Sequence, residues 1–180
     1  PPCGGKPVSH QEVRIDSVDP ENVPGEILTK GPNVLLGYYK NEEATRQVLD
    51  ADGWFHTGDL GTMDADQNIY IKGRSKNMLL GSNGQNIYPE EIEDKLNSLP
   101  LVSECLVVQR GEKLVGLVYP DLEEAKELGL NDADIKNLME ENRKKLNELT
   151  PAYCKLSDIE ILNEEFIKTP KRSIKRYLYK

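Results

Sequence analysis

Short alternating apolar runs, interrupted by glycine, proline and polar turns, characterise the first part of the chain. Such runs predict strands. The strand-like positions are Val13, Ile15 and Val18, followed by residues 26–30 and then 69–71. Asn41 precedes two acidic residues and so predicts the N-cap of a helix that ends near Leu49. Residues 1 to about 75 are therefore predicted to be mostly β, with one short helix.

The second part changes to helical spacing. Pro89 suits a first helical position, and apolar side chains recur at i, i+4 and i+7 as Ile92, Leu96 and Leu99. The elements predicted beyond this helix are a hairpin of residues 102–109 and 114–119, a long helix capped by Asn131 that ends near Leu149, and a strand at 157–162. This order predicts a small α+β domain with helices packed on a sheet.

The segment between the two parts, residues 71–93, reads IKGRSKNMLLGSNGQNIYPEEIE. Glycine tolerates positive φ and close backbone approach, so Gly73, Gly81 and Gly84 indicate sharp turns or a neighbour that presses against the backbone. The segment is predicted to contain a strand, a pivot, a loop and the start of a helix.

Composition narrows the class of protein. The chain has 180 residues, of which 37% are hydrophobic and 30% charged, as in a globular protein of one or two domains. No apolar run approaches the ~20 residues of a transmembrane helix, although contact with a membrane surface stays open. The net charge of −8 argues against general nucleic-acid binding, which requires a basic surface.

The cysteines and the basic residues are unevenly placed. Cys3, Cys105 and Cys154 are odd in number, far apart and not clustered with histidine, so we expect neither a disulfide framework nor a metal site, and we predict reduced thiols in the cytoplasm. Residues 168–180 hold six Lys or Arg and no acid. This basic end is either solvated or directed at a small polyanion such as a nucleotide.

Four blocks in this order resemble the last part of the adenylate-forming superfamily, and specifically its AMP-forming acyl-CoA synthetases. They are GEILTKGPNVLLGYYKNEEAT, GWFHTGDLG, the segment 71–93 and the terminal TPKRSIKR. One block alone would be weak evidence, but four with plausible spacing are a strong signal. The family's phosphate loop would lie upstream, so we expect the chain to be the C-terminal part of a longer enzyme. The cofactors that the resemblance implies are ATP, Mg²⁺ and CoA.

The resemblance implies a nucleotide-binding role for two residues. Asp59 stands where the family's Asp binds the ATP ribose, and a carboxylate can accept hydrogen bonds from both ribose hydroxyls. Arg74 stands at the family's Arg near the nucleotide, where a planar guanidinium can bind ribose or phosphate oxygens. Without the resemblance, residues 57–59 would be interpreted as a capped turn and Arg74 as half of a surface ion pair.

Lys76 stands at the family's hinge position. The resemblance implies that residues 1–75 end a large domain and that 76–180 form a mobile lid, which rotates between acyl-adenylate formation and transfer to CoA. Lys76 is alternatively an exposed linker lysine, which is compatible with a hinge. Gly81, Ser82, Asn83 and Gly84 are predicted to line the CoA channel after rotation; a simple loop is the alternative.

The terminal block departs from the family pattern, Thr-x-x-Gly-Lys-x-x-Arg, whose Lys neutralises charge developing during adenylation. Alignment on Thr169 and Arg176 places Arg172 at the Gly and Ser173 at the Lys. Lys171 and Lys175 lie two residues to either side and would share a face if the segment were extended. We favour Lys175, because the Lys-Arg ending resembles that of long-chain acyl-CoA synthetases.

These observations lead to one predicted function and two alternatives. We predict part of a ligase that activates a carboxylic acid, expected to be a long-chain fatty acid, as the acyl-adenylate and transfers it to CoA. A related enzyme would use a carrier-protein phosphopantetheine as acceptor or stop at the adenylate. The competing class is a non-catalytic module that binds a nucleotide or a partner.

Overall fold

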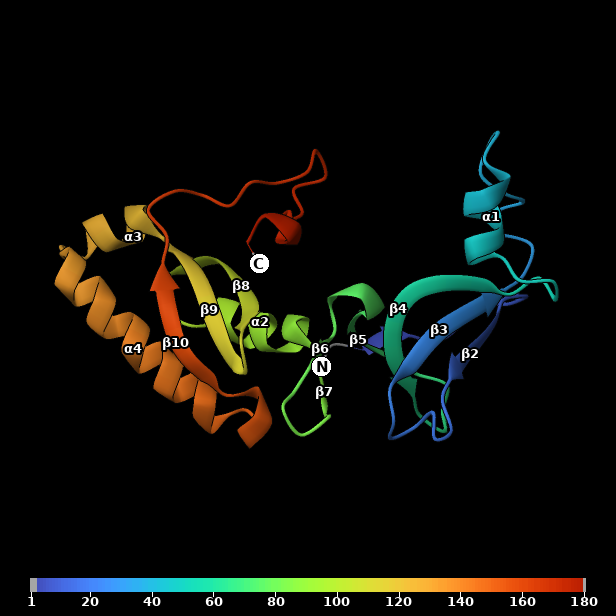
Figure 1. Ribbon diagram of the computed structural model, residues 1–180, viewed down its shortest axis with the longest axis horizontal. Coiled ribbons are helices and arrows are strands. Elements are labelled where there is room, and N and C mark those ends of the chain that lie inside the picture. The colour runs from blue at the N-terminus through green and yellow to red at the C-terminus, as the bar shows by residue number, and fades with distance from the viewer. Residues whose placement is uncertain (1–2, 180) are drawn as a thin grey trace. The chain divides into compact units, whose positions relative to one another are not determined.

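A computed structural model describes residues 3–179 of the chain. The chain forms two compact units, one up to Met78 and the other from Leu79 onward. Each unit has its own sheets (Figure 1).

The first unit is built on a five-stranded antiparallel sheet in the order β1-β5-β4-β3-β2. Its elements are β1 (Cys3–Gly5), β2 (Glu12–Asp16), β3 (Gly25–Lys30), α1 (Glu42–Val48), β4 (Phe55–Met63) and β5 (Ile69–Arg74), followed by the 3-10 turn η1 (Ser75–Asn77). Its buried apolar side chains are few, and come mainly from β2, β3 and β4: Ile15, Ile27, Leu28 and Leu60.

Most predicted elements of this unit are confirmed. Asn41 caps α1, because its side-chain oxygen accepts from the backbone N–H of Ala44 at 3.0 Å. The strand position proposed for Val18 is wrong: this side chain lies outside β2 and is 99% exposed. The nine-residue strand β4 was not predicted, since its glycines and polar residues hide the alternation. Gly58, within β4, has a φ of +71° and lies where the pairing of β4 with β3 is irregular.

The second unit contains a three-stranded sheet in the order β10-β9-β8, in which β9 pairs antiparallel with β8 and parallel with β10. A two-stranded ribbon, β6-β7, precedes it. The elements are β6 (Leu79–Leu80), β7 (Asn86–Ile87), α2 (Pro89–Asn97), β8 (Val102–Arg110), β9 (Lys113–Pro120), α3 (Leu122–Glu127), α4 (Asp132–Glu148), η2 (Ala152–Cys154), β10 (Leu156–Ile161) and η3 (Arg176–Leu178).

Both faces of the three-stranded sheet are covered. On one face, α2 packs against β8 and α4 against β10, around buried Leu96, Val118 and Leu146 (Figure 1). On the other face, the C-terminal segment brings Phe166 onto the alternate side chains of β8 and β9, with Leu162, Ile174 and Tyr179 packed around it. Burial on both faces explains why these two strands are almost continuously apolar in sequence.

The α+β class is confirmed for this chain, as are the helix opened by Pro89, the hairpin and the final strand. Asn131 caps α4 in a full capping box with Asp134. The short helix α3 and the parallel pairing of β10 were not predicted. Across residues 3–179, no helix has the length and apolar character needed to cross a membrane.

Candidate functional site

Asp59 and Arg74 lie opposite each other in the β4–β5 ladder, in the first unit. The Arg74 Nη1 donates to Asp59 Oδ1 at 2.5 Å, and the side chains of Arg74 and Asp59 are 46% and 35% exposed, respectively. The contact engages Oδ1 of the carboxylate and one nitrogen of a five-donor guanidinium. Sheet pairing therefore brings together two residues that sequence analysis had placed at one nucleotide.

The backbone beside Asp59 is held by Glu26, which sequence analysis did not single out. Its Oε1 accepts from the N–H of Gly58 at 2.8 Å, while Oε2 contacts Nδ1 of His56 at 2.9 Å. Gly58 has a φ of +71°, which a residue with a side chain rarely adopts. Glu26 thus orients the turn of backbone that presents Asp59; its position inside a quoted block was the only sequence signal.

Lys76 lies in η1, directly after β5, and is exposed. The division between the two units falls two residues later, between Met78 and Leu79. The segment 75–77 forms a single 3-10 turn, with Met78 N–H donating to the carbonyls of Arg74 and Ser75. A hinge role for Lys76 stays a prediction.

The loop from Gly81 to Gln85 is a tight connection between β6 and β7. The Gly84 N–H donates to the Gly81 carbonyl at 2.9 Å, and the Gly81 N–H donates to the Gln85 carbonyl at 2.8 Å. Gly84 has a φ of +77°, so its glycine is a conformational requirement. The side chain of Gln109 donates to the Leu80 carbonyl at 3.1 Å and ties this ribbon to β8.

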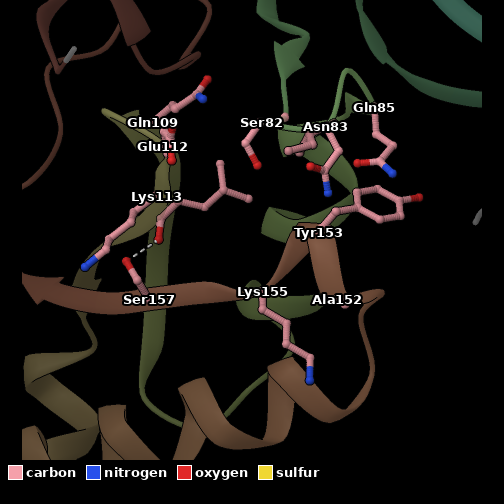
Figure 2. A pocket seen from close by; sticks show the side chains of 13 residues that line it. Ser82, Asn83, Gln85, Gln109, Glu112, Lys113, Ala152, Tyr153, Lys155 and Ser157 are labelled. Carbon is pink, nitrogen blue, oxygen red and sulfur yellow. Dashed lines mark hydrogen bonds between the residues drawn. The ribbon is translucent and has the colours of Figure 1, made fainter.

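A surface pocket of about 410 Å³ lies beside this loop, entirely within the second unit. Figure 2 shows Ser82 and Asn83 on one side and Tyr153 below them, with Lys113 and Lys155 extending outward from different parts of the rim. Ser157 donates to the Leu114 carbonyl at 2.8 Å and so joins β10 to β9 in the pocket wall. The pocket is lined by polar and apolar side chains in similar measure and carries two lysines, Lys113 and Lys155, and one carboxylate, Glu112. The lysines can attract an anionic, hydrogen-bonding ligand. No local sequence pattern marks either lysine, because only the folding of the second unit brings them to this pocket.

The terminal block folds as a turn. Thr169 N–H donates to the Ser173 carbonyl and Arg172 N–H to the Thr169 carbonyl, both at 2.8 Å, and Arg172 has a φ of +62°. The segment is therefore not extended, and the condition under which Lys171 and Lys175 would share a face does not hold. Lys171 is exposed on the turn, and Lys175 is half-buried at its base, where its N–H donates to the Ile167 carbonyl at 2.9 Å.

Arg176 and Glu93 form a contact that joins this terminal segment to α2. Glu93 is buried, and desolvation raises the pKa of its carboxyl group, an effect that the Arg176 guanidinium opposes. Its Oε1 also accepts from the backbone N–H of Val107 at 2.6 Å.

Comparison with known proteins follows the same division of the chain. Residues 76–179 match the family model described as the AMP-binding enzyme C-terminal domain. The chain belongs to this family. The matched range of this AMP-binding enzyme C-terminal domain contains the loop from Gly81 to Gln85 (the glycine loop), the pocket beside it and the turn within residues 168–176 (the terminal turn). Asp59 and Arg74 precede the matched range.

Curated relatives of this AMP-binding enzyme C-terminal domain include CoA ligases. A 2-succinylbenzoate–CoA ligase of Bacillus cytotoxicus is 46% identical over 117 residues, which are 63% of this chain and 24% of that protein. A feruloyl-CoA synthase of an Amycolatopsis species is 44% identical over 108 residues, 58% of this chain and 22% of that protein. The chain spans about a quarter of the length of these relatives.

Solved structures reproduce the fold over nearly the whole chain. The anthranilate CoA ligase AuaEII, in complex with anthranoyl-AMP, superposes with a TM-score of 0.82 at 26% identity, covering 98% of this chain and 33% of that protein. The O-succinylbenzoate CoA synthetase of Bacillus subtilis, in complex with AMP, has a TM-score of 0.77 at 24% identity and covers 99% and 35%.

Proposed function

We propose that this chain is the C-terminal part of an ATP-dependent ligase that activates a carboxylic acid as an acyl-adenylate and transfers the acyl group to CoA. Membership of the AMP-binding enzyme C-terminal domain family is the observation that carries the proposal. The names of the curated relatives, a 2-succinylbenzoate–CoA ligase and a feruloyl-CoA synthase, support CoA as the acceptor.

In this function Asp59 and Arg74 bind the nucleotide. The pairing of the two side chains across β4 and β5 supports a shared site, since Arg74 orients the carboxylate while keeping further donors for ribose or phosphate oxygens. Mg²⁺ would accompany the ATP phosphates, as in the O-succinylbenzoate CoA synthetase structure described with ATP and magnesium ion. We assign no residue of this chain to the metal.

Residues 1–75 are proposed to end the large domain, and 76–180 to act as a lid that turns about Lys76. The exposed turn η1 and the unit division beside it support this assignment. A short irregular connection can absorb a backbone rotation while the sheets on either side stay intact.

The loop of Gly81, Ser82, Asn83 and Gly84 is proposed to line the path of CoA. Its position on the wall of the 410 Å³ pocket supports this role, because the neighbouring Lys113 and Lys155 can bind phosphate oxygens as point charges. Small side chains in the loop leave room for a thin pantetheine arm.

For the adenylation step we propose Lys175 as the cation that neutralises charge between the acyl carboxylate and the α-phosphate. Arg172 adopts the left-handed conformation at the position where the family has Gly, which supports the alignment that leaves Ser173 at the lysine position. Lys171, exposed on the same turn, is the second candidate.

Two classes of acid are proposed as substrate. The Lys175-Arg176 ending favours a long-chain fatty acid, by resemblance, and the names of the relatives favour an aromatic acid. Thioester formation with palmitate, 2-succinylbenzoate and ferulate separates the two.

The decisive experiment measures ATP–pyrophosphate exchange and CoA thioester formation by the full-length protein and by this chain alone. We expect both activities in the full-length protein and no pyrophosphate release from the chain. Asp59→Asn should weaken the nucleotide-dependent step, and Lys175→Ala should lower exchange by roughly 100-fold or more. Thioester formation from supplied acyl-adenylate should persist in Lys175→Ala.

Lys171→Ala is the matched control, and Ser173→Lys in the Lys175→Ala background should restore exchange. Loss of exchange in Lys171→Ala, with Lys175→Ala unaffected, would reverse the assignment of the lysines. Nucleotide binding by the full-length protein without exchange would instead support a non-catalytic module.

A further inference from the structure

Glu93 lies where the helix that follows the glycine loop meets the edge of the sheet. Strand β8 is an edge strand of the order β10-β9-β8, so part of its backbone has no partner strand. Glu93 Oε1 accepts from the Val107 N–H at 2.6 Å and occupies part of this edge. The carboxylate therefore replaces a neighbouring strand at this point, and its position is set by the sheet.

The second oxygen of Glu93 faces the terminal segment. Arg176 Nη2 donates to Oε2 of Glu93 and lies 3.8 Å from Oε1 of Glu90. The side chain of Glu93 is only 10% exposed and that of Arg176 25%. Removing one partner of a buried pair leaves a desolvated charge, which is far more costly than the loss of a surface pair.

A second ion pair holds the other end of the same turn. Lys168 Nζ lies 2.7 Å from Glu104 Oε1, and these side chains are 25% and 26% exposed. Lys168 matches Arg176 in exposure, but its main partner is more accessible than Glu93. Solvent can therefore replace the Lys168 contact more readily than the Arg176 contact.

Between these two anchors, Ile174 packs against the apolar cluster that contains buried Phe166. An isolated bridge joins Lys168 to Ile174, and Phe166 and Tyr179 meet edge to face with ring centroids 5.0 Å apart. The three residues at the tip, Lys171, Arg172 and Ser173, are exposed. The direction in which the tip points is therefore set at its base.

We propose that Arg176 is a positioning residue, which through Glu93 fixes the terminal turn and the adjacent Lys175 on the sheet. The catalytic consequence rests on the proposed function, in which this turn supplies the cation for adenylation. Loss of the pair would leave the terminal basic residues attached but misplaced, and a misplacement of about 1 Å can cost on the order of 100-fold in rate.

Amide hydrogen exchange of this chain tests the docking directly. The reporters are the N–H groups of Ile167, Thr169 and Lys175, which bond within the segment. In Arg176→Gln we expect their exchange to accelerate roughly tenfold or more, and in Arg176→Lys less than about threefold. Lys168→Gln, the matched control, should change them less than Arg176→Gln does.

The double variant Glu93→Gln/Arg176→Gln keeps the test meaningful if the single change unfolds the chain. The amide side chain introduced by Glu93→Gln retains an oxygen that can accept from the Val107 N–H, so the sheet edge should stay protected while the three terminal amides exchange rapidly. Unchanged terminal exchange in this folded double variant would overturn the docking role.

Kinetics of the full-length protein test the catalytic consequence. Arg176→Gln should lower kcat for ATP–pyrophosphate exchange by roughly 10- to 100-fold with the KM for ATP nearly unchanged, and Arg176→Lys should recover most of it. Rapid terminal exchange with normal kcat would refute positioning for catalysis. Absence of exchange activity in the wild-type protein would refute the proposed function while leaving the docking result intact.

Discussion

Arg172 has a φ of +62°, in the left-handed region that residues with side chains rarely adopt. This conformation costs an L-residue about 1–2 kcal/mol relative to its preferred regions. The turn nevertheless closes, because the Thr169 N–H donates a hydrogen bond to the Ser173 carbonyl. Arg172 therefore has a glycine-like backbone conformation at the position where the family pattern has Gly.

Replacing Arg172 with Gly should therefore stabilise the turn by about 1 kcal/mol, which corresponds to roughly fivefold slower exchange of the Thr169 and Arg172 amides. Lys171→Gly is the control: Lys171 lies next to Arg172 but does not share its positive φ, so glycine there should accelerate exchange. Equal effects of the two substitutions would show that the backbone angle of Arg172 is not a source of strain.

Helix α2, strand β8 and the terminal segment meet at one carboxylate. Burial raises the pKa of Glu93 above the ordinary value of 4.5, so the folded chain binds this proton more tightly than the unfolded chain does. The charged groups that face it are Arg176 and Glu90. By linkage, the part of the free energy of unfolding that comes from this pKa shift is present in full below pH 4.5 and is lost as pH rises through the raised pKa.

Glu93→Gln should remove this part of the pH dependence. The free energy of unfolding of both proteins is measured by urea unfolding, followed by circular dichroism, between about pH 4 and pH 8. As pH rises, Glu93→Gln should become more stable relative to wild type. Glu112→Gln, which removes a carboxylate at an exposed position, is the control. A pH-independent difference for Glu93→Gln would contradict the raised pKa.

The two units differ in how much apolar surface they bury. Both apolar clusters, one on each face of the three-stranded sheet, are composed of residues from the second unit. The first unit has a short set of buried apolar residues in β2, β3 and β4 and none in α1. Units of this size are marginally stable unless a substantial core forms.

Accordingly, a fragment of residues 79–180 should fold alone and unfold cooperatively, whereas residues 1–78 alone should lack a cooperative thermal transition. Circular dichroism melting of both fragments, with the intact chain as reference, measures this. The opposite pattern would show that the stability of the second unit depends on the first.

Predictions from sequence succeeded where local signals agree with long-range packing. Asn131 marks the start of α4 through a capping box, and the apolar stripe of Ile92 and Leu96 becomes a buried helix face. Strand β4 was not predicted, because its glycine and polar residues lack strand alternation. They are held in the sheet by partners from other strands: Glu26 accepts from the Gly58 N–H, and Arg74 lies opposite Asp59.

The amino-acid sequence by itself determined the α+β class and most element types on either side of residues 71–93, whereas the roles of Asp59, Arg74 and Lys76 are implied only by the family resemblance. The class and the element types depend on periodicity, caps and turns, which operate over a few residues. Only tertiary structure decided that Glu26 supports Asp59, that Lys113 and Lys155 line the same pocket as the glycine loop, and that Arg176 docks on Glu93. Those contacts join residues far apart in sequence, and sheet order, which brings them together, leaves no local pattern.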